Sequence, residues 1–326
     1  MTTRVYRDEP ERPGRGAVKR GAPGRVLLLC LCVCLAGGCS VRKMAVNKLG
    51  NALAESGTTF ASDDDPELVK AAVPFALKLM ESLLAESPEH EGLLFATSSG
   101  FTQYAYAFVQ QEADELEERD HAAAQAMRER ARRLYLRARN YGLRGLEARH
   151  RGFVEALGND RERALRRMRK ADVRLLYWTA ASWAAAISVL KDDPDLIADV
   201  ALVEALIDRA FALDPDFDHG AIHTFLISYE PSRQGAEAGA EARSRAHFAR
   251  AMELSGGQQA GPLVALAETI AVQKQDVAEF RALLNQALAI DPDTRPEWRL
   301  VNLVMQRRAA WLLARTEDLF LLPQGE

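Results

Sequence analysis

Apolar and polar residues do not alternate along this chain in the way that a half-buried strand requires, and β-branched residues form no alternating run. Ala, Leu, Glu and Arg dominate the sequence, and all four favour the α-helix. Where apolar residues recur, they recur three or four positions apart, which places them on one stripe of a helix. The pattern therefore predicts an all-α protein.

Capping residues and helix breakers divide the chain into a series of predicted helices. Pro74 is expected to kink or split one of them, and the small residues 98–100 are expected to interrupt another. Gly142, Gly145 and Gly152 are further expected breaks. The predicted helices span residues 41–55, 65–86, 91–118, 120–156, 159–170, 173–190, 195–213, 218–229, 240–254, 262–273, 276–290 and 295–316.

A heptapeptide with Ala, a following apolar residue and a terminal Asp-Pro recurs along the chain. Near-complete copies occupy residues 209–215 and 286–292, and weaker copies occupy residues 250–256 and 82–88. Ala lets two helices approach closely, and Asp before Pro ends a helix. The copies resemble the end of the second helix of a tetratricopeptide repeat, which has a period of about 34 residues. We expect an α-solenoid of degenerate tetratricopeptide-like helix pairs, in which each pair packs on the next.

The N-terminus has the pattern of an export signal. A basic tail precedes the apolar run Val26–Leu35, which is too short to cross a bilayer that needs about 20 residues. All four cysteines lie between Cys30 and Cys39, and the last follows the small residues 36–38. This end resembles a bacterial lipobox, which implies a signal peptide at residues 1–38 and a lipid on Cys39. The alternative is a signal peptide that merely contains cysteines. Residues 39–326 are then a single helical-repeat domain.

Removal of residues 1–38 would change the chemistry of the chain. The mature chain would have no free thiol, which excludes cysteine catalysis and thiolate metal sites. It would retain 35 basic and 43 acidic residues, and this acidic balance argues against binding of nucleic acid. A basic stretch at residues 161–170 is either a solvated helix face or a local dock for an acidic partner.

Signatures of catalysis are missing from the sequence. It contains no phosphate-binding glycine loop and no G-x-S-x-G turn. His219 and His223 are four residues apart, as in a zinc-binding helix, but no Glu follows His219 and no third ligand can be identified. We interpret both histidines as structural. We expect no enzyme activity, no metal and no cofactor.

Several stretches together resemble the T-component family of tripartite ATP-independent periplasmic (TRAP) transporters, which are periplasmic lipoproteins built from degenerate tetratricopeptide repeats. These stretches are residues 52–60, 63–68, 72–78, 175–183 and 302–313. The resemblance implies an accessory scaffold that docks the periplasmic solute-binding (P) component of the transporter. It also implies a homotrimer that encloses a central pore. That pore, or a groove in the protein, would accommodate a hydrophobic ligand.

The remaining expectations concern location and the alternative function. Ser40 after the lipidated Cys39 implies sorting to the outer membrane, with the protein held at the periplasmic side by its N-terminal lipid. The alternative is a general repeat-based protein–protein adaptor in envelope assembly, which would share the anchor and the fold.

Three groups of residues are candidate ligand or partner contacts. Each group has an alternative explanation, because aromatic residues also fill gaps between helices and polar residues four apart also bond neighbouring helices. The candidates are Ser98, Ser99 and Tyr104 near the expected helix break, Tyr177, Trp178 and Trp183 on one helix, and Asn302, Gln306 and Arg308 on the last long helix.

Overall fold

A computed structural model describes residues 2–3, 46–53, 57–189, 197–233, 235 and 238–321. Residues from Val46 to Glu326 form one compact unit. Apart from residues 2–3, the proposed signal peptide lies outside the described residues, as do Cys39 and Ser40. The lipid anchor therefore stays a prediction.

Every secondary-structure element among the described residues is a helix, and none is a strand, which confirms the all-α prediction. The first half comprises α2 (Gly57–Ala61), α3 (Pro66–Glu86), α4 (Glu91–Ala105), α5 (Gln111–Leu116), α6 (His121–Arg149), α7 (Phe153–Asn159), α8 (Arg161–Arg166) and α9 (Val173–Val189). The second half comprises α11 (Val200–Leu213), α12 (Phe217–Tyr229), α13 (Ala240–Leu254), α14 (Ala260–Leu266), α15 (Val272–Lys274), α16 (Val277–Leu288), α17 (Arg299–Ala314) and α18 (Thr316–Leu319).

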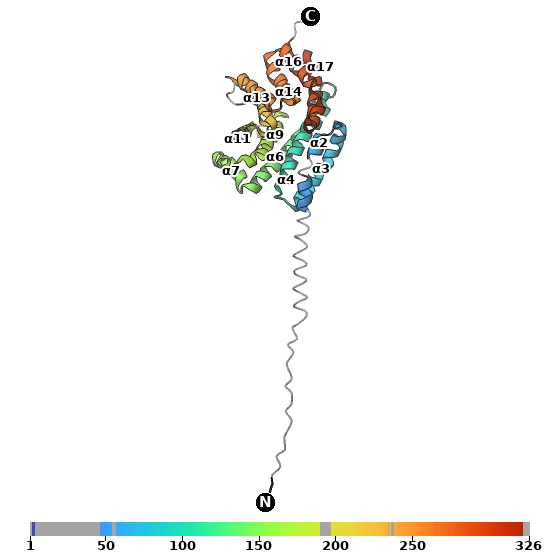
Figure 1. The fold of residues 1–326 in the computed structure, drawn as a ribbon. Coiled ribbons are helices and arrows are strands. Elements are labelled where there is room, and N and C mark those ends of the chain that lie inside the picture. The colour runs from blue at the N-terminus through green and yellow to red at the C-terminus, as the bar shows by residue number, and fades with distance from the viewer. Residues whose placement is uncertain are drawn as a thin grey trace. The chain divides into compact units, whose positions relative to one another are not determined.

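Most helices pack against near neighbours in the chain. The strongest pairings join α4 to α6, α6 to α9 and α9 to α11, and then α12 to α13, α14 to α16 and α16 to α17. The apolar residues collect in four clusters between these pairs rather than in one central core. In Figure 1, α7 and α11 lie on one side of the body, and α17, α2 and α3 lie on the other.

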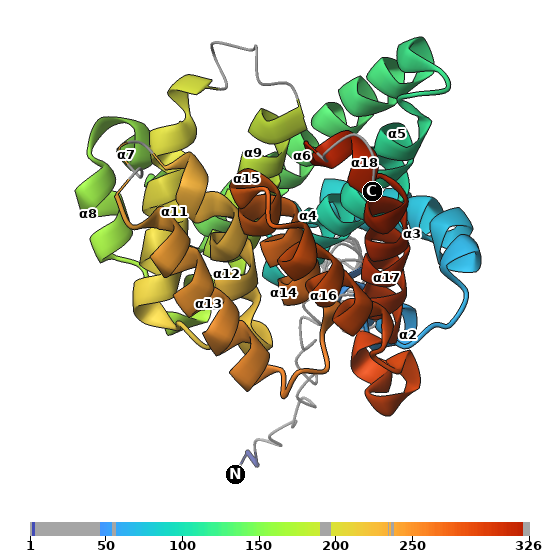
Figure 2. The ribbon, with the colours of Figure 1, turned by 90° about the horizontal axis from the view of Figure 1, so that it is seen from above.

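The chain does not remain a one-way stack, because its last long helix returns to its first helices. Helix α17 contacts both α2 and α3, and Figure 2 shows α17 beside α3. Arg299 near the start of α17 donates a hydrogen bond to the backbone oxygen of Ser62, at 2.8 Å. The C-terminal helices therefore close onto the N-terminal ones.

Three expected interruptions, at residues 98–100, at Gly142 and at Gly145, were wrong. Helix α4 runs without a break through residues 98–100, and α6 runs through Gly142 and Gly145. The chain does break at Gly152, which has a φ of +77°. Pro74 lies inside α3 and does not split it.

The small residues mark close contacts between helices instead of helix ends. A Cβ atom on Gly142 would lie 2.2 Å from the Oγ1 of Thr179 on α9, and one on Gly145 would lie 2.7 Å from Leu175. A Cβ on Gly100 would lie 2.9 Å from Leu77 on α3. Tertiary packing therefore explains the residues that look like breakers in the sequence.

The helical run from α4 to α5 and the run from α14 to α15 are each interrupted by a π-helical segment. The two segments are η1 (Tyr106–Gln110), which joins α4 to α5, and η4 (Ala267–Ala271), which joins α14 to α15. Such π-helical segments are rare in proteins, and those that occur are often found at functional sites. Within the described residues, no helix is long and apolar enough to span a bilayer.

Candidate functional site

The two π-helical segments both adjoin α17. The hydroxyl of Tyr106 in η1 lies 3.7 Å from the sulfur of Met305, and Glu268 in η4 forms an ion pair with Arg308. Met305 and Arg308 are three residues apart on α17, so they share a helix face. We call this meeting point the π junction, defined by η1, η4 and α17.

Arg308 is the central charge of the π junction. Its Nε donates to the Oε1 of Glu268 at 3.0 Å, and its Nη1 donates to the Oδ2 of Asp114 on α5 at 2.8 Å. Its guanidinium group also lies over the ring of Trp311, 4.4 Å from the centroid. Burial by itself would lower the pKa of Arg308, but Glu268 and Asp114 raise that pKa above its ordinary value. The cation is therefore fixed in position and charge.

A second arginine joins α17 to α5 beside it. Arg307 donates two hydrogen bonds to the carboxylate of Glu115, at 2.8 and 2.6 Å, in the bidentate geometry that arginine favours. Arg128 on α6 forms further ion pairs with Asp114 and Glu117. The acidic residues of α5 thus bind arginines from both α6 and α17.

A cavity of about 320 Å³ opens beside the π junction, between α3, η1 and α17. Gln111 is only 1 % exposed at this cavity, and neither of its amide atoms makes a hydrogen bond of normal geometry to a described residue. The lining is mainly apolar with a few polar groups, which is the usual character of a small-ligand site. Its residues are Pro66, Glu67, Ala107, Phe108, Gln111, Leu303, Val304 and Arg307.

This arrangement suits binding better than catalysis. The arginines of the π junction are each paired with carboxylates, so they are poor proton donors and have no free partner to activate. Burial raises the pKa of Tyr106 to about 12, with Glu268 adding to the effect, which makes its hydroxyl a poor base or nucleophile. No three His, Cys, Asp or Glu side chains within the described ranges are placed to hold a metal ion.

Arg308 is the only one of the three candidate residues on α17 that lies at the π junction. Asn302 is 1 % exposed, and its amide accepts from the N–H of Ala260 and donates to the oxygen of Gln258, both at 2.9 Å. Gln306 donates to backbone oxygens at the end of α16, the closest being that of Ile290 at 2.7 Å. These two amides hold α17 to the start of α14 and the end of α16.

The serines of α4 lie inside the helix packing. Ser98 is fully buried, and its Oγ lies 3.1 Å from the position of a Cβ on Gly142. Ser99 donates to the oxygen of Ala96, and Tyr104 packs against Phe108, with ring centroids 5.7 Å apart. The ring of Tyr104 also borders Arg130. None of the three lines the cavity, and their role as contacts stays a prediction.

The aromatic residues of α9 divide into two environments. Trp183 is 5 % exposed, donates from its Nε1 to Asp199 at 3.2 Å, and lies under the guanidinium of Arg139. Tyr177 contacts Trp178 edge-on and packs against Phe217 in a tilted arrangement, and burial raises the pKa of its hydroxyl. The structure therefore brings Tyr177 and Trp178 together but places Trp183 elsewhere along α9.

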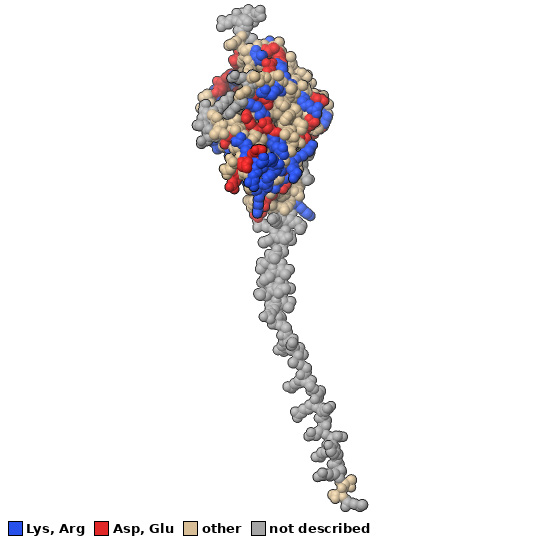
Figure 3. Space-filling model, turned by 90° about the vertical axis from the view of Figure 1, so that its left-hand side faces the viewer, with Lys and Arg blue, Asp and Glu red and all other residues tan. Residues whose placement is uncertain are grey.

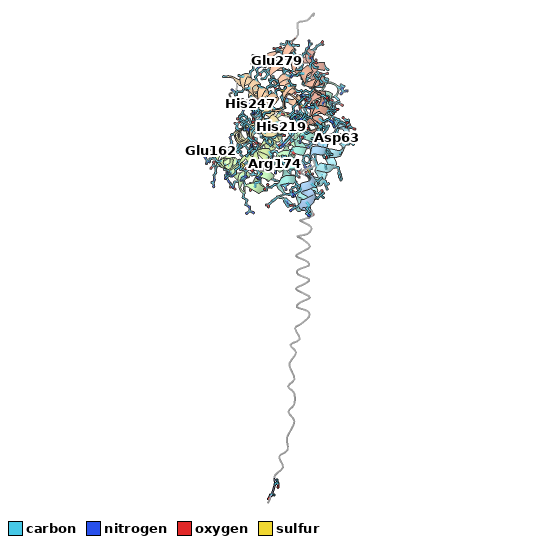
Figure 4. All side chains as sticks on the ribbon, viewed as in Figure 1. Asp63, Glu162, Arg174, His219, His247 and Glu279 are labelled. Atoms are coloured by element: carbon cyan, nitrogen blue, oxygen red, sulfur yellow. The ribbon has the colours of Figure 1, made fainter. Side chains whose placement is uncertain are left out.

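The histidines form a pair that the sequence did not reveal. The Nδ1 atoms of His223 and His247 lie 2.8 Å apart, and the ring of Phe211 contacts both. Burial lowers the pKa of His223 to about 4, and His247 adds to this effect. His219, whose own φ is +53°, instead packs its ring against that of Trp298, with centroids 5.1 Å apart. Figure 4 shows His219 and His247 at separate positions. No signal in the sequence links α12 to His247 on α13.

Known proteins are similar in sequence to this chain over most of its length. The family model described as "TRAP transporter T-component" matches residues 62–320. A protein of Treponema pallidum (strain Nichols), described as an uncharacterized protein, is 30 % identical over 305 residues. The match covers 88 % of this chain and 94 % of that protein.

Proposed function

Because this chain belongs to the TRAP transporter T-component family, we propose that it is an accessory lipoprotein that docks the solute-binding (P) component of such a transporter. The family match over residues 62–320 carries the proposal, since it spans nearly all the described helices. The family is one of transporter accessory proteins, not enzymes, and it associates the chain with the cell envelope. The paired charges of the π junction agree with a role in binding.

We place the protein on the periplasmic side of the outer membrane, held by a lipid on Cys39. The apolar run Val26–Leu35 followed by small residues and Cys39 supports this placement. Cys39→Ser should move the protein from the membrane fraction to the soluble fraction. A Cys39→Ser protein that stays in the membrane fraction would rule out the lipid anchor.

The docking surface that we propose for the P component is an exposed apolar stripe on α3. Leu68 and Phe75 are seven residues apart and so share a face, and they are 58 % and 75 % exposed. Large apolar side chains on one exposed face are typical of protein interfaces. The stripe belongs to the helix that also borders the cavity, through Pro66 and Glu67.

The cavity supports the finer part of the proposal, a site for a hydrophobic ligand. Phe108, Leu303 and Val304 supply its apolar lining, and Gln111 and Arg307 supply polar groups that would fix one end of a ligand. We also propose tetratricopeptide-like stacking and a homotrimer, as the family resemblance implies. The sequential helix pairings support the first of these, and sedimentation of the purified body tests the second.

Affinity capture tests the central claim. A chain of residues 40–326 is used to capture proteins from the native envelope extract, and mass spectrometry identifies them. We expect a periplasmic solute-binding protein, with at least about a tenfold loss for Phe75→Glu, because interface energy concentrates in a few large side chains. Leu288→Glu is the matched control, since Leu288 is an exposed apolar residue on a different helix.

The alternative function predicts a different result from the same capture. Recovery of envelope assembly factors by both the unmodified body and Leu288→Glu would favour a general adaptor. Recovery of the solute-binding protein by Phe75→Glu at an unchanged level would retain the transporter role but remove α3 as the docking surface.

A further inference from the structure

A strongly basic surface covers the segment that links α6 to η2 (Lys170–Asp172). Between residues 151 and 170 the chain carries seven basic and three acidic residues, although the whole sequence has an acidic excess. Figure 3 shows a dense cluster of Lys and Arg side chains low on the face that it displays. We call this surface the basic face, and its exposed cations are Arg151, Arg161, Arg163, Arg166, Arg167, Arg169 and Lys170.

Local contacts leave much of this charge available. Arg166 pairs with Glu162 at its own helix surface, and Lys170 pairs with Asp214 at 3.1 Å. The Arg166–Glu162 pair is exposed on both sides and contributes little, and Lys170 is itself exposed although Asp214 is partly buried. Within the described part of the chain, Arg161 and Arg163 form no ion pair. The basic face therefore retains a net positive field.

The basic face lies at the end of the body where the chain enters. Residues 46–53 pack on the turn before α4, where Asn47 contacts the hydroxyl of Ser87 at 3.0 Å. The next residues along that turn lead to Glu91, which pairs with Arg149 at the end of α6, at 3.6 Å. The start of the compact unit and the basic face are thus joined through one short set of contacts. In Figure 4, Glu162 of the basic face lies low on the body, away from Glu279 on the C-terminal helix α16 near the top.

We propose that the basic face rests on anionic lipid headgroups and so orients the body against the membrane that holds its N-terminus. The proposal rests on the anchor at Cys39. The seven residues from Cys39 to Val46 can reach at most about 25 Å when fully extended, so this end of the body must stay near the lipid surface. A lipid chain and a polybasic patch acting together are a recognised way to hold a protein stably on a membrane.

Two further observations favour a lipid surface over an acidic protein. Val154 is 45 % exposed among the cations, and an apolar side chain there can enter the headgroup region. The cations are spread over exposed helices and turns. Among them Lys170 borders a cavity of about 560 Å³, which it shares with Arg149, Arg174 and Asp214. The wide spread of the other cations suits the diffuse charge of a membrane. Glu86, Glu89 and Glu91 are exposed around the turn before α4 and weaken the attraction. Because the attraction is between exposed charges, added salt should weaken the binding.

Vesicle flotation tests the proposal without the lipid anchor, using a chain of residues 40–326 that retains the complete compact unit. The probes are vesicles of phosphatidylcholine alone and vesicles with about 30 % phosphatidylglycerol, whose negative surface attracts basic segments. We expect binding to the anionic vesicles only, at about 0.1 M salt, and its loss at about 1 M, where charge is screened. Absence of binding to the anionic vesicles at low salt would overturn the proposal.

Charge reversal identifies the surface responsible. Arg161→Glu with Arg163→Glu balances the charge of the basic face, and acidic residues suit the first turn of α8. We expect at least about a tenfold weaker partition onto anionic vesicles. Arg119→Glu with Arg281→Glu makes the same charge change on exposed residues of other elements and should bind as the unmodified chain does. Equal loss in both double variants would overturn the assignment to the basic face.

Other outcomes separate this proposal from the proposed function. If the Arg161/Arg163 variant binds vesicles normally but loses capture of the solute-binding protein, the basic face is a protein dock and the membrane proposal fails. If Cys39→Ser leaves the protein in the membrane fraction while vesicle binding behaves as expected, the anchor fails and the basic face stands. Thermal unfolding of each variant confirms that the body remains folded.

Discussion

The interface between α6 and α9 and the interface between α5 and α17 are built in opposite ways. The first is uncharged where the helices are closest, because Gly142 and Gly145 leave room for Thr179 and Leu175. The second is held by ion pairs, with Arg308 bonded to Asp114 across 194 residues of sequence. The first joins helices close in the chain order, and the second closes the C-terminal helices onto the N-terminal ones.

The contrast shows how one helical protein combines two kinds of specificity. Close packing through glycine depends on shape, and any added atom must displace a neighbour. A buried ion pair depends on both partners being present, because removal of one leaves an unpaired charge away from water. We therefore expect the α6–α9 interface to reject added volume and the α5–α17 interface to reject lost charge.

The largest effect is expected from added volume at α6. Gly142→Leu should lower the free energy of unfolding by about 3 kcal/mol, because even its Cβ would clash with the side chain of Thr179. Urea denaturation followed by circular dichroism measures the change. Gly158→Ala is the control, since a Cβ at Gly158 meets nothing within 4 Å, and it should change stability by less than about 0.5 kcal/mol. Equal effects of the two substitutions would refute a role for close packing.

A smaller loss is expected from removal of charge at the π junction. Arg308→Ala should cost about 2 kcal/mol, because it leaves Asp114 and Glu268 without their shared cation. Arg307→Ala should cost no more than about 1 kcal/mol, since the side chain of Arg307 is 38 % exposed. The same denaturation experiment compares them. A greater cost for Arg307→Ala would show that Arg308 is not the main cation of this interface.

In a third region, around His223 and His247, the free energy of unfolding should depend on pH. The pKa of His223 is lowered from 6.5 to about 4 in the folded state, so the unfolded chain binds protons that the folded chain does not. The stability from the neutral histidine is fully present above pH 6.5 and is lost as pH falls from about 6.5 toward 4. The full pKa difference corresponds to about 3 kcal/mol. Because solvent screens part of the effect, we expect a loss of about 2 kcal/mol over this range.

The control for this effect is His223→Gln, which removes the ionisable group. The unfolding free energy of the unmodified chain should fall more steeply below pH 6.5 than that of His223→Gln. Parallel pH profiles would show that the pKa of His223 is the same in the folded and the unfolded chain. Substitution of His219, which lies apart from the pair, should leave the slope unchanged.

Local sequence signals located the helices well where caps or breakers act through neighbouring residues. Helix α13 spans the predicted residues 240–254, and α3 begins at Pro66, with the side chain of Asp65 accepting from the N–H groups of Glu67 and Leu68. The signals failed at residues 98–100 and at Gly142, where small size serves a neighbouring helix. Propensity contains no information about the helix that packs there.

The candidate site was predicted only in part for the same reason. Arg308 was among the candidates, but the sequence could not show that its partners are Asp114 and Glu268. The cavity beside it is lined by residues such as Phe108 and Leu303 that no motif distinguishes. The His223–His247 pair joins two helices whose contact is not visible in either one.

The sequence by itself determined the helical class, most helix ends, the export signal as a prediction, and the resemblance to a family that the comparisons then bore out. These depend on periodicity, capping and short motifs, which act over a few residues. Only the tertiary structure decided that α17 returns to α5, that glycines serve as contact points, and that two π-helical segments meet at Arg308. These depend on pairs of residues far apart in the chain, whose proximity is set by packing.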